Sequence, residues 1–175
     1  MRFIPCLIFV FAVELLLAYP AQAEPPGSAF SGVLNATYII EKRKVHLIDG
    51  RAEVQAAPGS AAKITTAVFG KPVCGDLDGD GRDDAALFLV HDSGGSGTFH
   101  YVAAAIAQNG IYQGTNAVLL GDRIDLRTIQ IQNGVIVADY ADRRPDQSMV
   151  APPSIHKTMY LMLKEGHLEA IKAPW

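Results

Sequence analysis

Short alternating or apolar runs separated by turn pairs dominate the pattern of hydrophobic and polar residues along the chain. Asp49-Gly50, Asn109-Gly110 and Asn133-Gly134 each separate two such runs, and Glu165-Gly166 does so in a weaker form. An Asx-Gly pair between such runs is typical of a β-hairpin, because both turn residues must adopt positive φ. The pattern therefore predicts a series of antiparallel hairpins.

The runs between these turns carry residues that suit β-strands. Apolar residues alternate with polar or small ones within 128–132 and 135–140, and 85–90 is a continuous apolar run, as in a central strand. No stretch of helical length has a 3.6-residue period, and only 60–69 is compatible with a short helix. We predict an all-β fold, an antiparallel meander of hairpins that forms a small sandwich or a partial-propeller-like sheet, with few or no helices.

The first 23 residues have the features of a secretory signal peptide. Arg2 supplies a positive charge, residues 7–17 form an apolar run interrupted by Glu14, and Ala21-Gln22-Ala23 is a small-residue cleavage site. No later segment approaches the roughly 18 apolar residues that a membrane-spanning helix needs. We therefore expect a periplasmic or secreted protein with no membrane span after cleavage.

The rest of the chain has the composition of one globular domain. Residues 24–32 are rich in Pro, Gly and Ser and predict a flexible lead-in, which leaves 33–175 as a single β domain. The fifteen Lys and Arg residues against eighteen Asp and Glu leave no basic surplus, which argues against nucleic acid as a partner. Cys74 is the one cysteine after the signal peptide, so no internal disulfide is possible, and we expect it to be a buried structural thiol.

The segment 76–84 (DLDGDGRDD) has the spacing of a calcium-binding loop. Its carboxylates stand at relative positions 1, 3, 5 and 9, and Gly81 at position 6 permits the sharp bend that curls the chain around a cation. The residue at position 7 supplies its backbone carbonyl. The expected ligands of the Ca²⁺ ion are Asp76, Asp78, Asp80 and Asp84, together with the backbone carbonyl of Arg82.

Two observations limit the alternatives for this loop. Five aspartates in nine residues repel one another with only Arg82 to offset them, so a solvated acidic turn without an ion carries an electrostatic cost. An EF-hand would continue to a glutamate at position 12, but that position is Leu87, inside the apolar run. The loop is therefore expected to lead into a strand rather than a helix.

The residues around this loop resemble an FG-GAP repeat, the integrin-type calcium-binding blade. Phe69-Gly70 precedes the loop with Val73 and Gly75-Asp76 at the expected spacing, Asp84-Ala85-Ala86 follows it, and 97–102 is similar to the closing strand. The resemblance covers 69–102 and implies the same metal ligands. The Gly-Ala-Pro element of the family is replaced by Val90-His91-Asp92. A propeller needs at least about four blades, so the single copy excludes a full propeller.

Residues 91–100 permit an alternative interpretation as a hydrolase site. Ser96 or Ser93 would be the nucleophile, His91 or His100 the base, and Asp92 the residue that orients it. The segment does not match a nucleophile elbow, since Thr98 stands where that motif has glycine. A Gly/Ser loop that joins two strands explains the same residues.

Taken together, these features predict an exported, non-enzymatic calcium-binding β domain that serves as a binding or structural module of the cell envelope. Its partner would be an envelope or secreted protein, and the loops 93–97 and 142–154 are the expected contact surface, because loops on rigid scaffolds often carry function. Two alternatives remain open at this point, the hydrolase and a proteinaceous inhibitor of an envelope or secreted enzyme.

Overall fold

The computed structural model describes residues 30–175, so the expected signal peptide (1–23) and residues 24–29 of the lead-in lie outside the described residues. Within that range the chain forms one four-residue helix, α1 (Ser31–Leu34), and twelve strands. The strands are β1 (Thr37–Ile40), β2 (Arg43–His46), β3 (Arg51–Gln55), β4 (Lys63–Gly75), β5 (Asp84–Asp92), β6 (Thr98–Gln108), β7 (Ile111–Gly114), β8 (Val118–Asp122), β9 (Asp125–Gln132), β10 (Val135–Asp142), β11 (Ile155–Lys164) and β12 (His167–Ile171).

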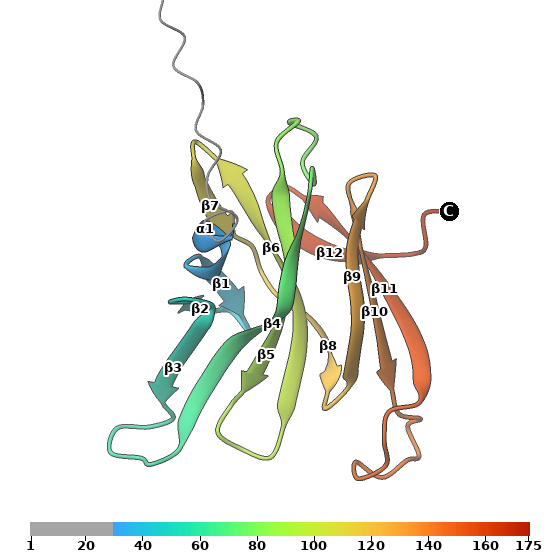
Figure 1. Cartoon of the computed structure of the whole chain (residues 1–175). Coiled ribbons are helices and arrows are strands. Elements are labelled where there is room, and N and C mark those ends of the chain that lie inside the picture. The colour runs from blue at the N-terminus through green and yellow to red at the C-terminus, as the bar shows by residue number, and fades with distance from the viewer. Residues whose placement is uncertain (1–29) are drawn as a thin grey trace, which may run out of the picture.

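The strands form three antiparallel sheets (Figure 1). The largest has the order β3-β4-β5-β6-β7, with β8 also paired to β6; the second has the order β12-β11-β10-β9; and β1 pairs with β2. The prediction of an all-β fold built from antiparallel strands is confirmed.

Three of the four expected hairpins are present. Asn109-Gly110, Asn133-Gly134 and Glu165-Gly166 join β6 to β7, β9 to β10 and β11 to β12, and all six residues have positive φ. Asp49-Gly50 also forms a turn with positive φ, but the strands on its two sides belong to different sheets. The hairpin expected there is reduced to one isolated bridge, between Ile48 and Arg51.

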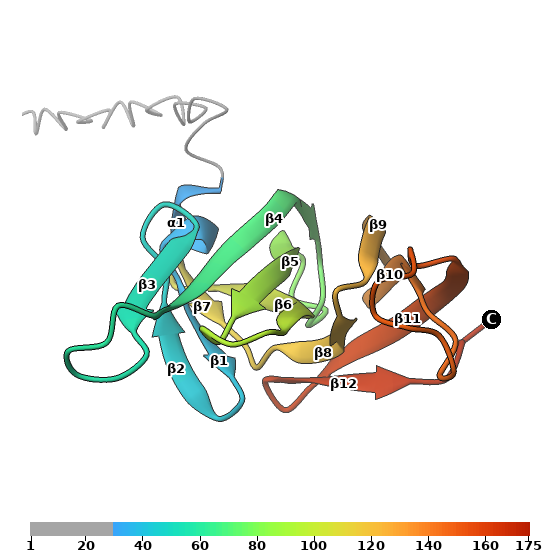
Figure 2. The ribbon, with the colours of Figure 1, turned by 90° about the horizontal axis from the view of Figure 1, so that it is seen from below.

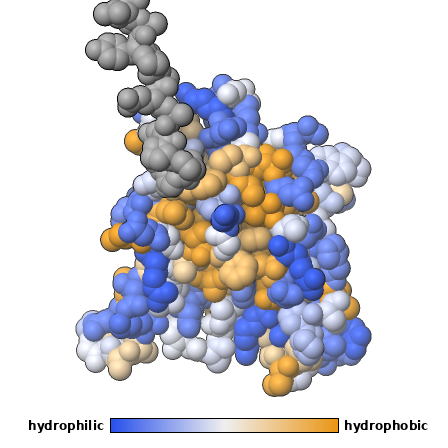
Figure 3. All heavy atoms as spheres, in the orientation of Figure 1, coloured by the Kyte–Doolittle hydropathy of each residue, from blue (hydrophilic) through white to orange (hydrophobic). Residues whose placement is uncertain are grey.

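The three sheets are stacked in layers with the six-stranded sheet in the middle (Figure 2). One face of this sheet packs against α1 and the β1-β2 hairpin, and the other packs against the four-stranded sheet. Along β5, Ala86 and Phe88 belong to the core between the six-stranded and the four-stranded sheet, whereas Leu87 and Leu89 belong to the core beneath α1 and the β1-β2 hairpin. This two-sided burial explains why 85–90 is a continuous apolar run. In the orientation of Figure 1, hydrophobic residues gather over the middle of the molecule and hydrophilic residues surround them (Figure 3).

Two local expectations are wrong. The stretch 60–69 is not helical, because most of it belongs to β4, whose backbone is paired with β3 and β5. Cys74 is exposed rather than buried, although the residue opposite it in the sheet, Ala85 of β5, is buried. The short helix α1 includes Ser31 and Gly32, so the last residues of the expected lead-in are helical.

Candidate metal centre

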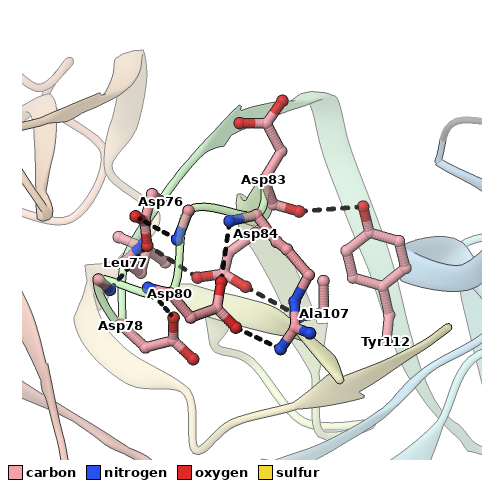
Figure 4. Close-up of polar contacts among 11 residues, drawn as sticks. Asp76, Leu77, Asp78, Asp80, Asp83, Asp84, Ala107 and Tyr112 are labelled. Carbon is pink, nitrogen blue, oxygen red and sulfur yellow. Dashed lines mark hydrogen bonds and ion pairs between the residues drawn. The ribbon is translucent and has the colours of Figure 1, made fainter. Parts of the chain in front are cut away.

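The acidic loop connects β4 to β5 at one end of the six-stranded sheet (Figure 1). Asp76 follows β4 directly, and Asp84 is the first residue of β5, as expected for a loop that leads into a strand. Asp76, Asp78 and Asp84 each offer a carboxylate oxygen, and these three oxygens lie within 4.8 Å of one another (Figure 4). Three of the four carboxylates predicted from the spacing are therefore brought together.

Asp76 organises the backbone of the loop. Its Oδ1 accepts a hydrogen bond from the Gly79 amide (2.7 Å), and its Oδ2 accepts one from the Gly81 amide (2.9 Å). These amides stabilise the charged carboxylate and lower the pKa of Asp76. Gly81 has a φ of 80°, which a residue with a side chain adopts only with strain. The loop is therefore curled around an ionised carboxylate.

Asp84 is the buried member of the cluster, with no exposed surface. Its Oδ2 accepts a hydrogen bond from the Leu77 amide (2.9 Å) and its Oδ1 accepts one from the Ala107 amide of β6 (2.8 Å). Burial nevertheless raises its pKa, and the neighbouring Asp78 carboxylate adds to this effect. Among residues 30–175, no Lys, Arg or His forms an ion pair with Asp84. The cluster thus contains a buried carboxylate with no cationic side chain to balance it.

Asp80 and Arg82 take a different position from the one expected. The Asp80 carboxylate accepts a hydrogen bond from the Arg82 amide (2.8 Å) and forms an ion pair with the Arg82 guanidinium, so it lies outside the group of three. Asp78 Oδ1 accepts a hydrogen bond from the Asp80 amide (3.1 Å). The side chain of Asp83 points away from the cluster (Figure 4), while its carbonyl accepts a hydrogen bond from the Tyr112 hydroxyl (3.3 Å).

The chemistry of this donor set fits a hard divalent cation. Three carboxylates carry a charge of about −3 when ionised, and oxygen is the ligand that Ca²⁺ and Mg²⁺ take in proteins. Ca²⁺ accepts six to eight oxygens in flexible geometry, so water or the neighbouring Asp80 would complete the set. No histidine or cysteine belongs to the cluster of Asp76, Asp78 and Asp84, which disfavours zinc or copper.

The structure brings only some of the residues considered for a hydrolase together, since His91 and Ser93 line one pocket while His100 lies on the opposite face of the sheet. Side chains alternate between the faces of a sheet, and the regular β5-β6 register pairs His91 with Phe99 and His100 with Val90. His91 therefore faces the β1-β2 side of the sheet, whereas His100 faces the four-stranded sheet. Burial lowers the pKa of both histidines, so both are neutral at pH 7. Ser96 is exposed in the loop between β5 and β6.

Sequence reasoning missed the polar residues that surround His91. His91 Nδ1 is hydrogen-bonded to Thr66 Oγ1 (2.8 Å), and the His91 ring packs edge-to-face on Tyr101, with 6.3 Å between the ring centroids. The Tyr101 hydroxyl donates to the Glu41 carboxylate (2.9 Å). These residues are separated by up to 60 positions in the chain, so only the fold brings them together.

Comparison of the chain with protein-family models, with curated proteins and with solved structures found no match. The likeness to the FG-GAP repeat is thus an interpretation of 69–102 alone. Within residues 30–175, no helix has the length and apolar character needed to cross a membrane.

Proposed function

We propose that the chain is an exported β domain that binds one Ca²⁺ ion through Asp76, Asp78 and Asp84. The observation that carries this proposal is the convergence of three carboxylates within 4.8 Å, one of them fully buried without a cationic partner. A cation at this point would offset both the mutual repulsion of the three groups and the cost of burying the Asp84 charge. Asp80 and the Arg82 carbonyl are the expected further ligands.

The ion would have a structural role. Asp84 is the first residue of the central strand β5. Its carboxylate accepts one hydrogen bond from the loop, at the Leu77 amide, and one from β6, at the Ala107 amide. Binding would hold these three segments in one geometry. Extracellular calcium modules bind with Kd values of about 10⁻⁴–10⁻³ M, which suits an ion that is always present rather than a signal.

The role of the domain would be that of a non-enzymatic binding or structural module in the periplasm or outside the cell. The loops 93–97 and 142–154 lie at the end of the molecule opposite the acidic loop (Figure 1), so a protein partner could contact them without approaching the ion. Arg143 stabilises the second loop, since it donates to the carbonyls of Ala151 (2.5 Å) and Arg123 (2.7 Å). Export predicts a mature N-terminus at Glu24, which intact-mass measurement of the secreted protein checks.

The test of calcium binding is thermal unfolding in EDTA, in 2 mM Ca²⁺ and in 2 mM Mg²⁺, concentrations chosen to exceed the usual Kd range. Mass action predicts that 2 mM Ca²⁺ stabilises the fold by about 0.6–1.8 kcal/mol, or a rise in Tm of about 2–6 °C for a domain of this size. Mg²⁺ should raise the Tm less, because it requires a near-ideal octahedral site.

The matched control compares two single charge removals on the same loop. Asp78→Asn removes a member of the cluster and should abolish the Ca²⁺-dependent rise in Tm. Asp83→Asn removes the same charge from a side chain that points away from the cluster, and should leave the rise intact. An equal response of both variants, or no response of the unmodified protein to Ca²⁺, contradicts the proposal.

A further inference from the structure

The four-stranded sheet is formed by one continuous segment, 125–171, and every strand of the other two sheets comes earlier in the chain. The chain therefore passes between the sheets once, through residues 123–124, which join β8 to β9 (Figure 2). Within residues 30–175, neither strand pairing nor a backbone–backbone hydrogen bond joins this sheet to the six-stranded sheet. The Asn116 side chain is hydrogen-bonded to the backbone of Leu168 across the interface. The contact between the sheets thus depends mainly on the apolar core between them.

The crossing from β8 to β9 has the geometry of a hinge. Arg123 has a φ of 48°, in the left-handed region that residues with a side chain adopt infrequently. Just before it, the β6-β8 register shifts between His100 and Tyr101, which marks a β-bulge. The crossing is attached to β6 at Thr98, whose carbonyl accepts the Arg123 amide (2.7 Å) and whose amide donates to Asp122 Oδ1 (2.8 Å). A few residues at the end of an element are enough to absorb the backbone change of a moving sheet.

His100 of β6 lies beneath this hinge. It is paired with Gly121 of β8, and it shares the face of Val102, which belongs to the core between the two sheets. The side chain is nine-tenths buried, and its Nδ1 is the one buried side-chain nitrogen or oxygen in the described residues that has no hydrogen-bond partner. A protonated imidazole donates from both ring nitrogens. The charged form would therefore bury an N–H group without an acceptor, a cost that the neutral form avoids.

The charged groups around this imidazole do not offset that cost. Asp122 acts on the ring from β8, but its carboxylate already accepts a backbone amide and is paired with Arg123 (3.0 Å). A second cation, Arg143, donates to the Arg123 carbonyl (2.7 Å). The residue opposite on β5 is Val90, and Tyr140 is the one titratable side chain among the residues of the core on this face, within the described part of the chain. Burial accordingly lowers the pKa of the imidazole, against weaker opposing effects of Asp122 and nearby backbone groups.

We infer that the crossing is an acid-operated hinge, in which protonation of His100 releases the sheet of 125–171 from the six-stranded sheet and exposes the apolar core between them. When the interface opens, the ring reaches water and binds a proton with the ordinary histidine pKa of about 6.5. The closed interface disfavours that proton. Its stability is therefore fully present above this pH and decreases as the pH falls through it. The inference goes beyond the proposed calcium binding, because His100 lies at the end of β6 away from the acidic loop.

The test is hydrogen exchange of the purified protein, followed by mass spectrometry in EDTA at pH 7.5 and at pH 5, on either side of the ordinary histidine pKa of about 6.5. Rates are corrected for the intrinsic pH dependence of exchange. Peptides from 118–171 should exchange about tenfold faster at pH 5, the order expected for burying one donor without an acceptor. Peptides from 63–75 should keep their protection, because β4 does not cross to the opening sheet.

Three variants separate the titration of His100 from a general effect of acid. His100→Leu has a similar size and cannot be protonated, so it should fold at pH 7.5 and lose the acid-dependent increase in exchange. His100→Gln keeps a polar group without a histidine titration and should lose the increase as well, which preserves the test if the leucine does not pack. The matched control is His91→Leu, at an equally buried histidine on the other face of the same sheet, and it should retain the increase in 118–171.

Three results would overturn the inference. They are unchanged exchange of 118–171 between the two pH values in the unmodified protein, an acid-dependent increase that His100→Leu and His100→Gln both retain, and an increase that extends equally to 63–75, which would indicate global unfolding. Because the exchange is measured in EDTA, a failure of calcium binding has no influence on the outcome.

Discussion

Replacing Asp84 with asparagine separates two roles of one carboxylate, the observed anchoring of two backbone amides and the proposed binding of calcium. The change keeps the size and shape of the side chain but removes its charge. Asp84 accepts two backbone hydrogen bonds, from Leu77 and from Ala107, with its two oxygens. An asparagine has one oxygen, so one of the two amides would face an NH₂ group and lose its acceptor.

The magnitude of the effect differs with and without calcium. In EDTA, a buried amide without an acceptor costs about 1–3 kcal/mol. Asparagine carries no charge, so the variant avoids the cost of burying an ionised carboxylate, which is the same effect that raises the pKa of Asp84. This gain offsets part of the loss. In 2 mM Ca²⁺ the unmodified protein gains a further 0.6–1.8 kcal/mol or so from binding, and the Asp84→Asn variant does not. The loss in free energy of unfolding should therefore be larger in Ca²⁺ by that amount.

Urea unfolding followed by circular dichroism, at neutral pH in EDTA and in Ca²⁺, gives the four free energies required. The informative quantity is the difference between the two calcium effects, because the cost of the broken hydrogen bond cancels in it. If Asp84→Asn is stabilised by Ca²⁺ as much as the unmodified protein is, then Asp84 is only a backbone anchor and the proposed ligand set is wrong.

Two further predictions concern the stability of the fold away from the loop. The ion pair to Lys157 (2.7 Å) lowers the pKa of Asp142, so this contribution is present at neutral pH and is lost as the pH falls through the folded-state pKa. Lys157→Gln should thus cost about 0.5 kcal/mol at pH 7 and nothing at the acid end of a urea-unfolding series; a difference independent of pH contradicts this. Gly114→Ala would place a Cβ 2.4 Å from the carbonyl oxygen of Thr37 and should lower the free energy of unfolding by about 2–3 kcal/mol, unlike Gly95→Ala in an exposed loop, where the nearest atom would lie 3.8 Å from the Cβ.

The turns and the central strand could be predicted from the sequence because their causes are local. An Asn-Gly pair adopts positive φ at both positions whatever surrounds it, and this fixed the hairpins at Asn109 and Asn133. The turn between β1 and β2 lacks this signature, because Glu41 and Lys42 adopt positive φ without a glycine. Asp49-Gly50 makes its turn as expected, yet only the tertiary packing sends β2 and β3 into different sheets.

The acidic loop was predictable for the same reason, and the remainder of the candidate sites was not. The 1-3-9 spacing was enough to bring Asp76, Asp78 and Asp84 together, because the intervening glycines curl the backbone. The spacing does not reveal that Asp80 is paired with Arg82, since this depends on which rotamers the folded loop selects. Nor could it reveal the pocket at His91, whose walls come from β2, β3 and β4 and meet only through long-range strand pairing.

The position of the acidic loop follows from the way β5 is buried. A strand covered on both faces must be apolar along its length, so polar chemistry on it is confined to its two ends. The charged end is Asp84, whose burial is tolerated with two backbone amides and, as we propose, a cation. The other end is His91, which burial keeps neutral and which faces the pocket. The central strand thus keeps the proposed cation site and the pocket at His91 at opposite ends, which is why a substitution at one end should leave the other undisturbed.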